Sequence, residues 1–549
     1  VRKGDVKEIV RACMTPLEEN ITVYLSESQI KSHSQILESQ SLDLTFNPSL
    51  KKIYLDKKSL TPDSYTSLIE GITKSFDGHF DYNAMKTATD HMLNPSCDGI
   101  TLVANDKSII DVHCSDTSIH LYGGAVDIGT TSVVLYIYDM TDGSLLGVYS
   151  GLNQQRESGA DVINRIMYCS QKPSGIDELQ ENILNTINSL IDKACIDTPH
   201  LKEHLYQLVM CGNSTMQHLF LGFDPVKLGQ SPFISVYRDT LVTNASLFNL
   251  NVPKKCQIIF LPLLGGFVGA DTTAVLLSVE ANQKRRLIID LGTNGEIAVS
   301  NGDQYMVAST ACGPALEGAG IEYGMRGSTG AIERFEILQD GIHYKVIGDS
   351  NPKGICGSGI VDIIAELLKI GVLDNTGKML SPEKFAIANP NSSLTKNLVT
   401  HGGKIAFMVV SPDDSFDGEG VYVTQKDIRQ VQLAKSAIFT GCQMLLDKYG
   451  LKGEELDEIL LAGAFGNYIN VNNAQHIGLI PAFDGVTIFS IGNAAGTGVQ
   501  QYLLNQLSSD RCKEIVQKTK HIELASDPDF QNLYVQNMYF KGVRGERGV

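Results

Sequence analysis

The sequence lacks several features that mark common classes of protein. It has no tryptophan, and its 11 cysteines include no Cys-x-x-Cys pair, which excludes a thioredoxin motif, a local metal cluster and a zinc knuckle. The most apolar run, residues 258–270, is too short to span a membrane and contains Pro262 and a pair of glycines. No secretory signal is visible. We therefore expect a cytoplasmic protein whose cysteines are reduced.

Basic residues are also scarce. The chain has 45 Lys and Arg against 62 Asp and Glu, and its net charge is −17. A surface of that sign repels phosphodiester backbones and anionic lipid headgroups, so we expect neither nucleic acid nor a membrane as a main partner.

The 549 residues are enough for several domains. Residues 26–43 are rich in Ser and Gln, which is typical of a linker. Residues 44–121 predict a small α+β middle domain with one strand, two helices and a hairpin. In residues 122–549 strands alternate with helices, which indicates mostly parallel α/β sheets with ligand at the carboxyl ends of the strands. We expect two lobes there, residues 122–285 and 286–549.

Two similar hairpins lie in these lobes. Residues 125–138 and 287–300 each contain β-type apolar runs interrupted by an aspartate, Asp127 or Asp290, and a glycine-rich turn with hydroxyl side chains. Backbone N–H groups and hydroxyls in such turns bind phosphate oxygens, while the aspartate binds Mg²⁺ or its waters. Each aspartate alone could instead cap N–H groups of its own bend. Two copies favour two half-domains closing on one nucleotide, with contacts from Gly129, Thr130, Thr131, Gly292, Thr293, Asn294 and Gly295.

Three further segments are candidates for nucleotide contacts. A glycine-rich loop leads to Asp271, which is either the N-cap of a helix or an acid that positions a water molecule. Gly357 and Ser358 precede another helix, where their N–H groups could face an anion or simply form a tight turn. A predicted strand ends in Ala462-Gly-Ala-Phe-Gly466, whose glycines would let the backbone approach a base and ribose closely.

The order of these segments resembles the actin/Hsp70/sugar-kinase-like ATPases, which have a two-lobed α/β fold. The resemblance implies that Asp271 orients the attacking water and that Gly463, Ala464, Phe465 and Gly466 contact adenosine. Our hypothesis assigns Asp127 and Asp290 to Mg²⁺, and Asp271 and Asp290 to catalysis.

Longer motifs resemble one family within this superfamily. They include Cys211-Gly-Asn-Ser-Thr-Met-Gln-His-Leu, Gly266-Phe-Val-Gly-Ala-Asp-Thr, Cys312-Gly-Pro-Ala-Leu-Glu-Gly and Ile491-Gly-Asn-Ala-Ala-Gly. From about residue 40 to about residue 540 the chain resembles ATP-dependent reductive activators of corrinoid proteins. The resemblance implies that ATP drives reduction of inactive Co(II) to Co(I) in a corrinoid protein of a methyltransferase system, in an anaerobe. It also implies a homodimer, an upstream electron donor and an N-terminal plant-type 2Fe–2S domain.

The beginning of the chain departs from that family pattern. The Cys-x₄-Cys-x₂-Cys run of a plant-type 2Fe–2S domain is absent. Cys13 is similar to the last cluster ligand of the family, so we expect residues 1–25 to be the C-terminal stub of that domain. We then expect this chain to bind ATP, Mg²⁺ and the corrinoid protein without carrying a 2Fe–2S cluster.

Two other functions also fit the residues. A small-molecule kinase of the same superfamily would use Asp271 to deprotonate a substrate hydroxyl, although the chain has no obvious sugar-binding signature. A non-catalytic binding module would change its partner affinity with nucleotide but would hydrolyse little ATP. An activator of the 2-hydroxyacyl-CoA dehydratase type, with a cluster held by Cys312 or Cys356, is a less favoured third reading.

Overall fold

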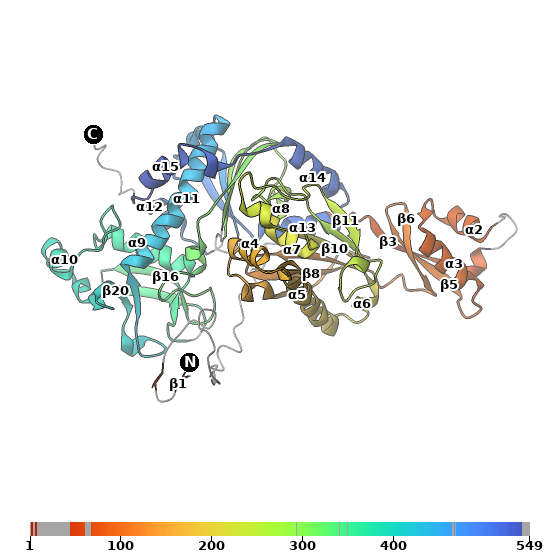
Figure 1. The fold of residues 1–549 in the computed structure, drawn as a ribbon, viewed down its shortest axis with the longest axis horizontal. Coiled ribbons are helices and arrows are strands. Elements are labelled where there is room, and N and C mark those ends of the chain that lie inside the picture. Colours follow the sequence, from red (N-terminus) through yellow and green to blue (C-terminus); the bar gives the residue numbers. More distant parts are fainter. Residues whose placement is uncertain are drawn as a thin grey trace.

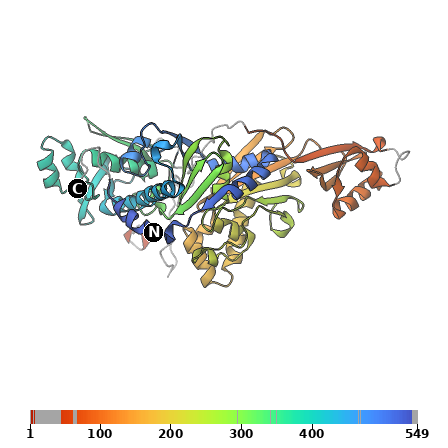
Figure 2. The ribbon, with the colours of Figure 1, turned by 90° about the horizontal axis from the view of Figure 1, so that it is seen from above.

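The computed structural model describes most of the chain after residue 43. The described residues are 2–3, 6–7, 44–60, 67–292, 294–339, 341–348, 350–463, 466 and 468–540. The predicted linker, Cys13, Thr293, Ala464 and Phe465 lie outside them, and of the predicted stub only a short antiparallel pair is described, β1 (Arg2–Lys3) and β2 (Val6–Lys7). Figures 1 and 2 show an elongated molecule with a small domain at one end, a first lobe in the middle and a second lobe beyond it.

The small domain contains a four-stranded sheet with its own core. Its strand order is β3–β5–β6–β4, and two helices accompany the sheet. The predicted strand, both helices and the hairpin are present. The elements are β3 (Leu50–Asp56), α2 (Leu68–Ser75), β4 (His79–Phe80), α3 (Tyr82–Leu93), β5 (Gly99–Asn105) and β6 (Ser108–Cys114). Their core is a small cluster separate from those of the two lobes, and it includes Ile72, Ile100 and Leu102.

The expectation that every cysteine is reduced is wrong for one pair. Cys97 and Cys114 form a disulfide, whereas the other eight cysteines in the described part of the chain are free thiols. Cys97 lies just before β5, and Cys114 ends β6, which pairs antiparallel with β5. A separation of 17 residues gave no sign of this contact, because only the pairing of the two strands brings the cysteines together.

The first lobe contains a six-stranded sheet of order β11–β12–β10–β7–β8–β9. Near-continuous apolar runs bury the middle strands β10 and β7 almost completely. Helices α4, α5 and α7 belong to this lobe, and α8 ends it (Figure 1). The elements are β7 (Tyr122–Ile128), β8 (Ser132–Asp139), β9 (Leu145–Leu152), α4 (Val162–Gln171), α5 (Gly175–Asp197), α6 (Leu201–His204), β10 (Leu205–Gly212), α7 (Ser214–Leu221), β11 (Leu241–Asn244), β12 (Gln257–Phe260) and α8 (Ala270–Ser278).

The second lobe has a six-stranded sheet of order β23–β22–β13–β14–β15–β24 and two smaller sheets. Its main elements are β13 (Arg285–Leu291), β14 (Gly295–Asn301), β15 (Gln304–Thr310), α11 (Gln425–Tyr449), β22 (Glu458–Ala462), α12 (Val471–His476), β23 (Thr487–Gly492), α13 (Ala494–Leu504), α14 (Leu507–Lys518), β24 (Thr519–His521) and α15 (Phe530–Gln536). The smaller sheets and their helices are β16 (Ala331–Leu338), β17 (Gly341–Val346), β18 (Gly354–Ile355), α9 (Gly357–Lys369), α10 (Pro382–Ala388), β19 (Leu398–His401), β20 (Lys404–Val410) and β21 (Val421–Thr424).

The two large sheets are mixed, which corrects the expectation of mostly parallel pairing. In the first sheet only β12–β10 and β10–β7 are parallel, and the other three pairs are antiparallel. In the second sheet three of five pairs are parallel. The reason is common to both lobes: each begins with a three-stranded antiparallel meander, β7–β8–β9 or β13–β14–β15, and the predicted hairpins form its first turn.

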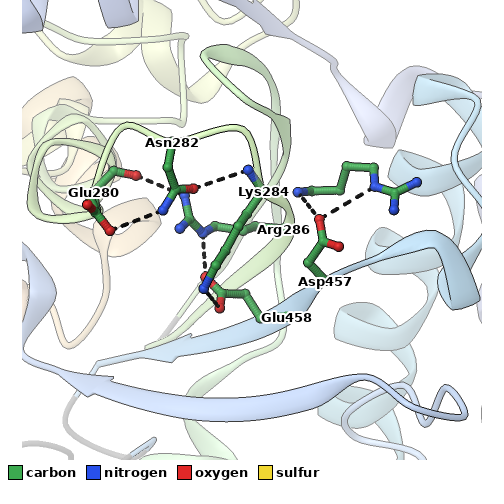
Figure 3. Close-up of polar contacts among 7 residues, drawn as sticks. Glu280, Asn282, Lys284, Arg286, Asp457 and Glu458 are labelled. Carbon is green, nitrogen blue, oxygen red and sulfur yellow. Dashed lines mark hydrogen bonds and ion pairs between the residues drawn. The ribbon is translucent and has the colours of Figure 1, made fainter.

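The two lobes meet along α8 and α13. Gly498 lets these helices approach closely, because an added Cβ there would lie 1.8 Å from the carbonyl oxygen of Ala274. The connection between the lobes is anchored beside β13, where buried Arg286 donates a hydrogen bond of 2.6 Å to Glu458 of β22 (Figure 3). Lys284 pairs with the same carboxylate at 2.7 Å. No helix of the described chain combines the length and apolar character needed to cross a bilayer.

Candidate functional site

The two predicted aspartates occupy equivalent places in the two sheets. Asp127 is near the end of β7, beside Cys211 of parallel strand β10. Asp290 is near the end of β13, beside Ala462 of parallel strand β22. Each hairpin turn that follows is closed by a glycine N–H: Gly129 donates to the carbonyl of Ser132, and Gly292 donates to that of Asn294, both at 3.0 Å. The structure therefore has the paired hairpins that the sequence predicts.

Four carboxylates influence one another around these strand ends. We call Asp127, Asp271, Asp290 and Glu296 the acidic cluster. Burial, with smaller contributions from the charges of Asp271 and Asp127, raises the pKa of Asp290 to about 7. Burial, with a smaller contribution from Asp127, raises the pKa of Asp271 to about 6. The pKa of Glu296 is raised well above its usual range by burial and by the same neighbours, Asp271 and Asp290.

The carboxylates of the acidic cluster raise the pKa of their neighbours, so their negative charges are only partly compensated. Hydrogen bonds from Asn493 and Cys211 oppose the rise that burial causes in the pKa of Asp127. Carboxylate oxygens are the ligands that a hard divalent cation such as Mg²⁺ prefers, and all four side chains of the cluster are partly accessible. A bound cation would lower the pKa of each carboxyl. The donor set therefore fits Mg²⁺.

The position of Asp271 in α8 tests the capping alternative for this residue. The N-cap of α8 is Gly269, so the alternative of Asp271 as N-cap is wrong. Asp271 instead lies in the first turn, and its Oδ1 accepts a hydrogen bond of 2.7 Å from the N–H of Thr272. Gly269 is needed for close approach, because an added Cβ would lie 2.5 Å from Cα of Asn213 and 2.8 Å from Oδ1 of Asp271.

The first predicted phosphate turn is held by side chains that the sequence analysis did not identify. Arg165 of α4 is completely buried and donates hydrogen bonds to the carbonyls of Thr130 and, at 3.0 Å, Gly159. Asn153 donates to the carbonyl of Gly129 at 2.9 Å, and Asn213 donates to Oγ1 of Thr130 at 2.9 Å. Binding the carbonyl groups in this way fixes the turn.

The second lobe contributes at two places. Thr131 of the first turn donates a 3.5 Å hydrogen bond to Glu317, which follows β15 in the glycine-rich segment. Gly463 lies directly after β22 with φ of +89°, and its N–H donates to the carbonyl of Gly492 at 2.9 Å. Gly466 donates to the carbonyl of Gly463 at 3.1 Å, and a Cβ added to Gly463 would lie 2.7 Å from Oδ1 of Asp290.

Gly357 and Ser358 are placed differently from the other candidates. They begin α9, and Ser358 is 3% exposed with its hydroxyl donating to the carbonyl of Glu333 at 2.8 Å. That hydroxyl is engaged within the fold, so a nucleotide contact here would have to use backbone N–H groups. Cys312 and Cys356 are both buried, and burial raises the pKa of Cys312, as expected for structural thiols.

One of the residues that the sequence analysis did not identify, Asn213, lies in a segment that could have indicated its role. Asn213 lies within the quoted Gly212-Asn-Ser-Thr segment and caps α7 by accepting from the N–H of Met216 at 3.0 Å. Arg165 carries no such signal, since an arginine in a short amphipathic helix is usually on the surface. Glu296 gives no such signal, because its position one residue beyond the predicted glycine turn is that of an ordinary strand residue.

Comparisons with known proteins agree with this architecture. A model described as "C-terminal domain of RACo the ASKHA domain" matches residues 284–546, and one described as "RACo middle region" matches residues 122–284. The two models meet at residue 284, in the connection between the lobes.

Two curated relatives and one solved structure are similar over much of the chain. Corrinoid activation enzyme RamQ of Eubacterium limosum is 43% identical over 542 residues, covering 98% of this chain and 90% of the relative. A [Co(II) methylated amine-specific corrinoid protein] reductase of Methanosarcina barkeri is 26% identical over 452 residues, covering 76% of each. The structure of a reductive activator for corrinoid, iron-sulfur protein has a TM-score of 0.80 and 29% identity, covering 91% of this chain and 80% of that one.

Proposed function

Because the chain belongs to the RACo family of corrinoid activation enzymes, we propose that it uses ATP to drive reduction of Co(II) to Co(I) in a corrinoid protein. The single observation that supports the ATP-dependent step is the acidic cluster. In it, the charge of Asp127 of the first lobe raises the pKa of Asp290 of the second. Hydrolysis at a site shared by two lobes can change how the lobes are arranged.

Such an enzyme needs coupling because the reduction is unfavourable. Each ~59 mV of uphill one-electron transfer costs about 1.4 kcal/mol. An activator helps only if it binds the partner differently in two states, since equal affinity for both shifts no equilibrium. We propose that the nucleotide-bound form binds the Co(II) partner in a way that destabilises that oxidation state.

In this proposal the two sheet-end aspartates hold the cation. Asp127 and Asp290, directly or through water, would bind Mg²⁺, which when bound supplies positive charge beside the phosphates. With a pKa of about 7, Asp290 holds its proton in part of the metal-free molecules at neutral pH, so cation binding releases that proton.

Asp271 is proposed to orient the attacking water. Its pKa of about 6 leaves it largely ionised at neutral pH, and its Oδ1 is already fixed by the N–H of Thr272. The second oxygen of the carboxylate would accept a hydrogen bond from the water. Phosphate oxygens would contact the turns of Thr130, Thr131 and Asn294, and adenosine would contact the segment 463–466.

The partner and the electron route are proposed on likeness to the family. The name of the Methanosarcina relative points to a corrinoid protein of a methylated-amine system, and we propose a partner of that chemical class. Electron delivery from an upstream donor through a 2Fe–2S cluster with Cys13 as a ligand, and assembly as a homodimer, are proposed on the family resemblance alone.

The direct test is ATP hydrolysis with and without a Co(II) corrinoid protein. We expect turnover that rises when the corrinoid protein is added and that is lost in Asp290→Asn. Glu181→Gln, which removes an exposed carboxylate on α5, is the matched control and should hydrolyse ATP normally. Turnover that rises with a sugar or organic acid but not with any corrinoid protein would overturn the proposal in favour of a kinase.

A further inference from the structure

Three side chains with affinity for soft metals lie together in the small domain, far in sequence from the acidic cluster. They are His91 in the last turn of α3, Cys97 in the connection to β5 and Cys114 at the end of β6. The nearest ligand atoms of the three all lie within 4.8 Å of one another. No metal-binding spacing was visible in the sequence, because the three residues belong to three different elements.

The arrangement is supported by the fold around it. Lys57 donates to the carbonyls of Asn94 at 2.7 Å, Cys97 at 3.3 Å and His91 at 3.5 Å, and so holds the end of α3 against the connection to β5. On the other side, the antiparallel register places Cys114 opposite Ile100, close to the start of β5. Cys97 is 2% exposed, whereas His91 and Cys114 are partly accessible, so an ion could reach the site from solvent.

We propose that the reduced form of this site binds a zinc-class divalent cation through His91, Cys97 and Cys114. One imidazole nitrogen and two thiolates are a typical three-residue zinc ligand set, with water in the fourth position. The disulfide must open first. A dithiol reductant supplies two electrons and two protons, gives two thiols and is itself oxidised to a disulfide. The cation then displaces both thiol protons, and the imidazole binds in its neutral form.

The disulfide in the oxidised state and the metal ion in the reduced state are therefore alternative cross-links between the same two segments of the small domain. The disulfide joins the connection after α3 to the end of β6, and the cation joins both to α3 as well. Only the reduced, metal-free form lacks a cross-link, so we expect the small domain to be least stable in that state. This inference does not depend on the ATPase activity.

The test uses Co²⁺ as a coloured substitute for zinc. The full chain carries Cys13→Ser, since Cys13 lies outside the described residues and is itself a thiol. After anaerobic reduction and desalting, we expect one equivalent of Co²⁺ to produce a thiolate-to-cobalt charge-transfer band, and Zn²⁺ to abolish it. The band should be absent in the oxidised protein and in Cys97→Ser, and present in the control Cys195→Ser, which alters a partly accessible free thiol elsewhere.

A second variant distinguishes loss of a metal ligand from misfolding of the small domain. His91→Gln keeps the disulfide and leaves both thiols available after reduction, so it should fold normally in the oxidised state and bind Co²⁺ more weakly by at least about tenfold. The proposal is overturned if the reduced protein shows no thiolate band, if the band survives Cys97→Ser, or if His91→Gln binds Co²⁺ as tightly as the parent.

Discussion

Gly463 lies so close to Asp290 that a Cβ added to the glycine would be 2.7 Å from Oδ1 of the carboxylate. Its φ of +89° also places it in the left-handed region, which favours glycine. We expect Gly463→Ala to displace Asp290 and to lower kcat/KM for ATP by about tenfold or more, since each ~1.4 kcal/mol of lost transition-state stabilisation is tenfold.

Gly485→Ala is the matched control for that prediction. Gly485 has a similar φ of +81°, but no heavy atom lies within 4 Å of its added Cβ. The Gly485→Ala variant should lose about 1 kcal/mol of stability from backbone strain and keep its ATPase activity. If thermal unfolding and ATP hydrolysis change equally in the two variants, the closeness of Gly463 to Asp290 has no functional role.

Replacing Asp290 should stabilise the metal-free protein while abolishing hydrolysis. Burial raises the pKa of Asp290 to about 7, so the folded state holds a proton that the unfolded state releases. Stability without Mg²⁺ therefore falls as pH rises between about pH 4 and about pH 7. We expect Asp290→Asn to raise the free energy of unfolding by about 1–4 kcal/mol at about pH 8. Urea titrations in a chelator at several pH values measure this, and an equal or lower stability at alkaline pH would contradict it.

Arg165 should be required both for stability and for the first phosphate turn. Arg165→Lys keeps a positive charge but cannot reach the carbonyls of Thr130 and Gly159 and the side chain of Gln155 together. Leaving buried acceptors unpaired costs about 1–3 kcal/mol each, so we expect a loss of at least about 2 kcal/mol and a higher KM for ATP. Arg334→Lys, at an exposed position of β16, should change neither quantity.

The ion pair between Arg286 and Glu458 should stabilise the connection between the lobes (Figure 3). Burial opposes ionisation of Glu458, but hydrogen bonds from Lys284 and Arg286 outweigh it and lower the pKa. Glu458→Gln leaves Arg286 without its partner charge, and breaking a buried pair costs about 3–5 kcal/mol. Because the pKa is lowered in the folded state, the difference from the parent should shrink as pH falls through the acidic range.

An exposed pair provides the comparison for Glu458→Gln. Asp510 and Lys513 are 2.8 Å apart with side chains 76% and 63% exposed, so Asp510→Asn should cost less than about 1 kcal/mol. If Asp510→Asn and Glu458→Gln lower the free energy of unfolding by similar amounts, burial of the Arg286–Glu458 pair contributes nothing to stability.

The sequence predicted the hairpins well because their signal is local. Apolar β-type runs on either side of Asp127 and Asp290 predict strand and turn together, and both hairpins form where expected. Strand direction was predicted less well, because each meander adds a second antiparallel pair between consecutive strands, whereas the parallel pairs β10–β7 and β13–β22 join segments far apart in the sequence. Arg165 and the pairing of Cys97 with Cys114 also depend on the tertiary fold, which places a helix behind the first turn and two strand ends side by side.

The most direct test of the account is formation of Co(I) in a corrinoid protein. The protein is mixed with a Co(II) corrinoid protein and a small-molecule one-electron donor that reaches the cobalt directly, without a 2Fe–2S cluster, and is too weak to complete the reduction alone. The cobalt absorption spectrum is then followed. The account predicts that Co(I) accumulates only when Mg²⁺ and ATP are present with the parent protein, and that Asp290→Asn gives none. Co(I) formation at the same rate without ATP, or with Asp290→Asn, would contradict it.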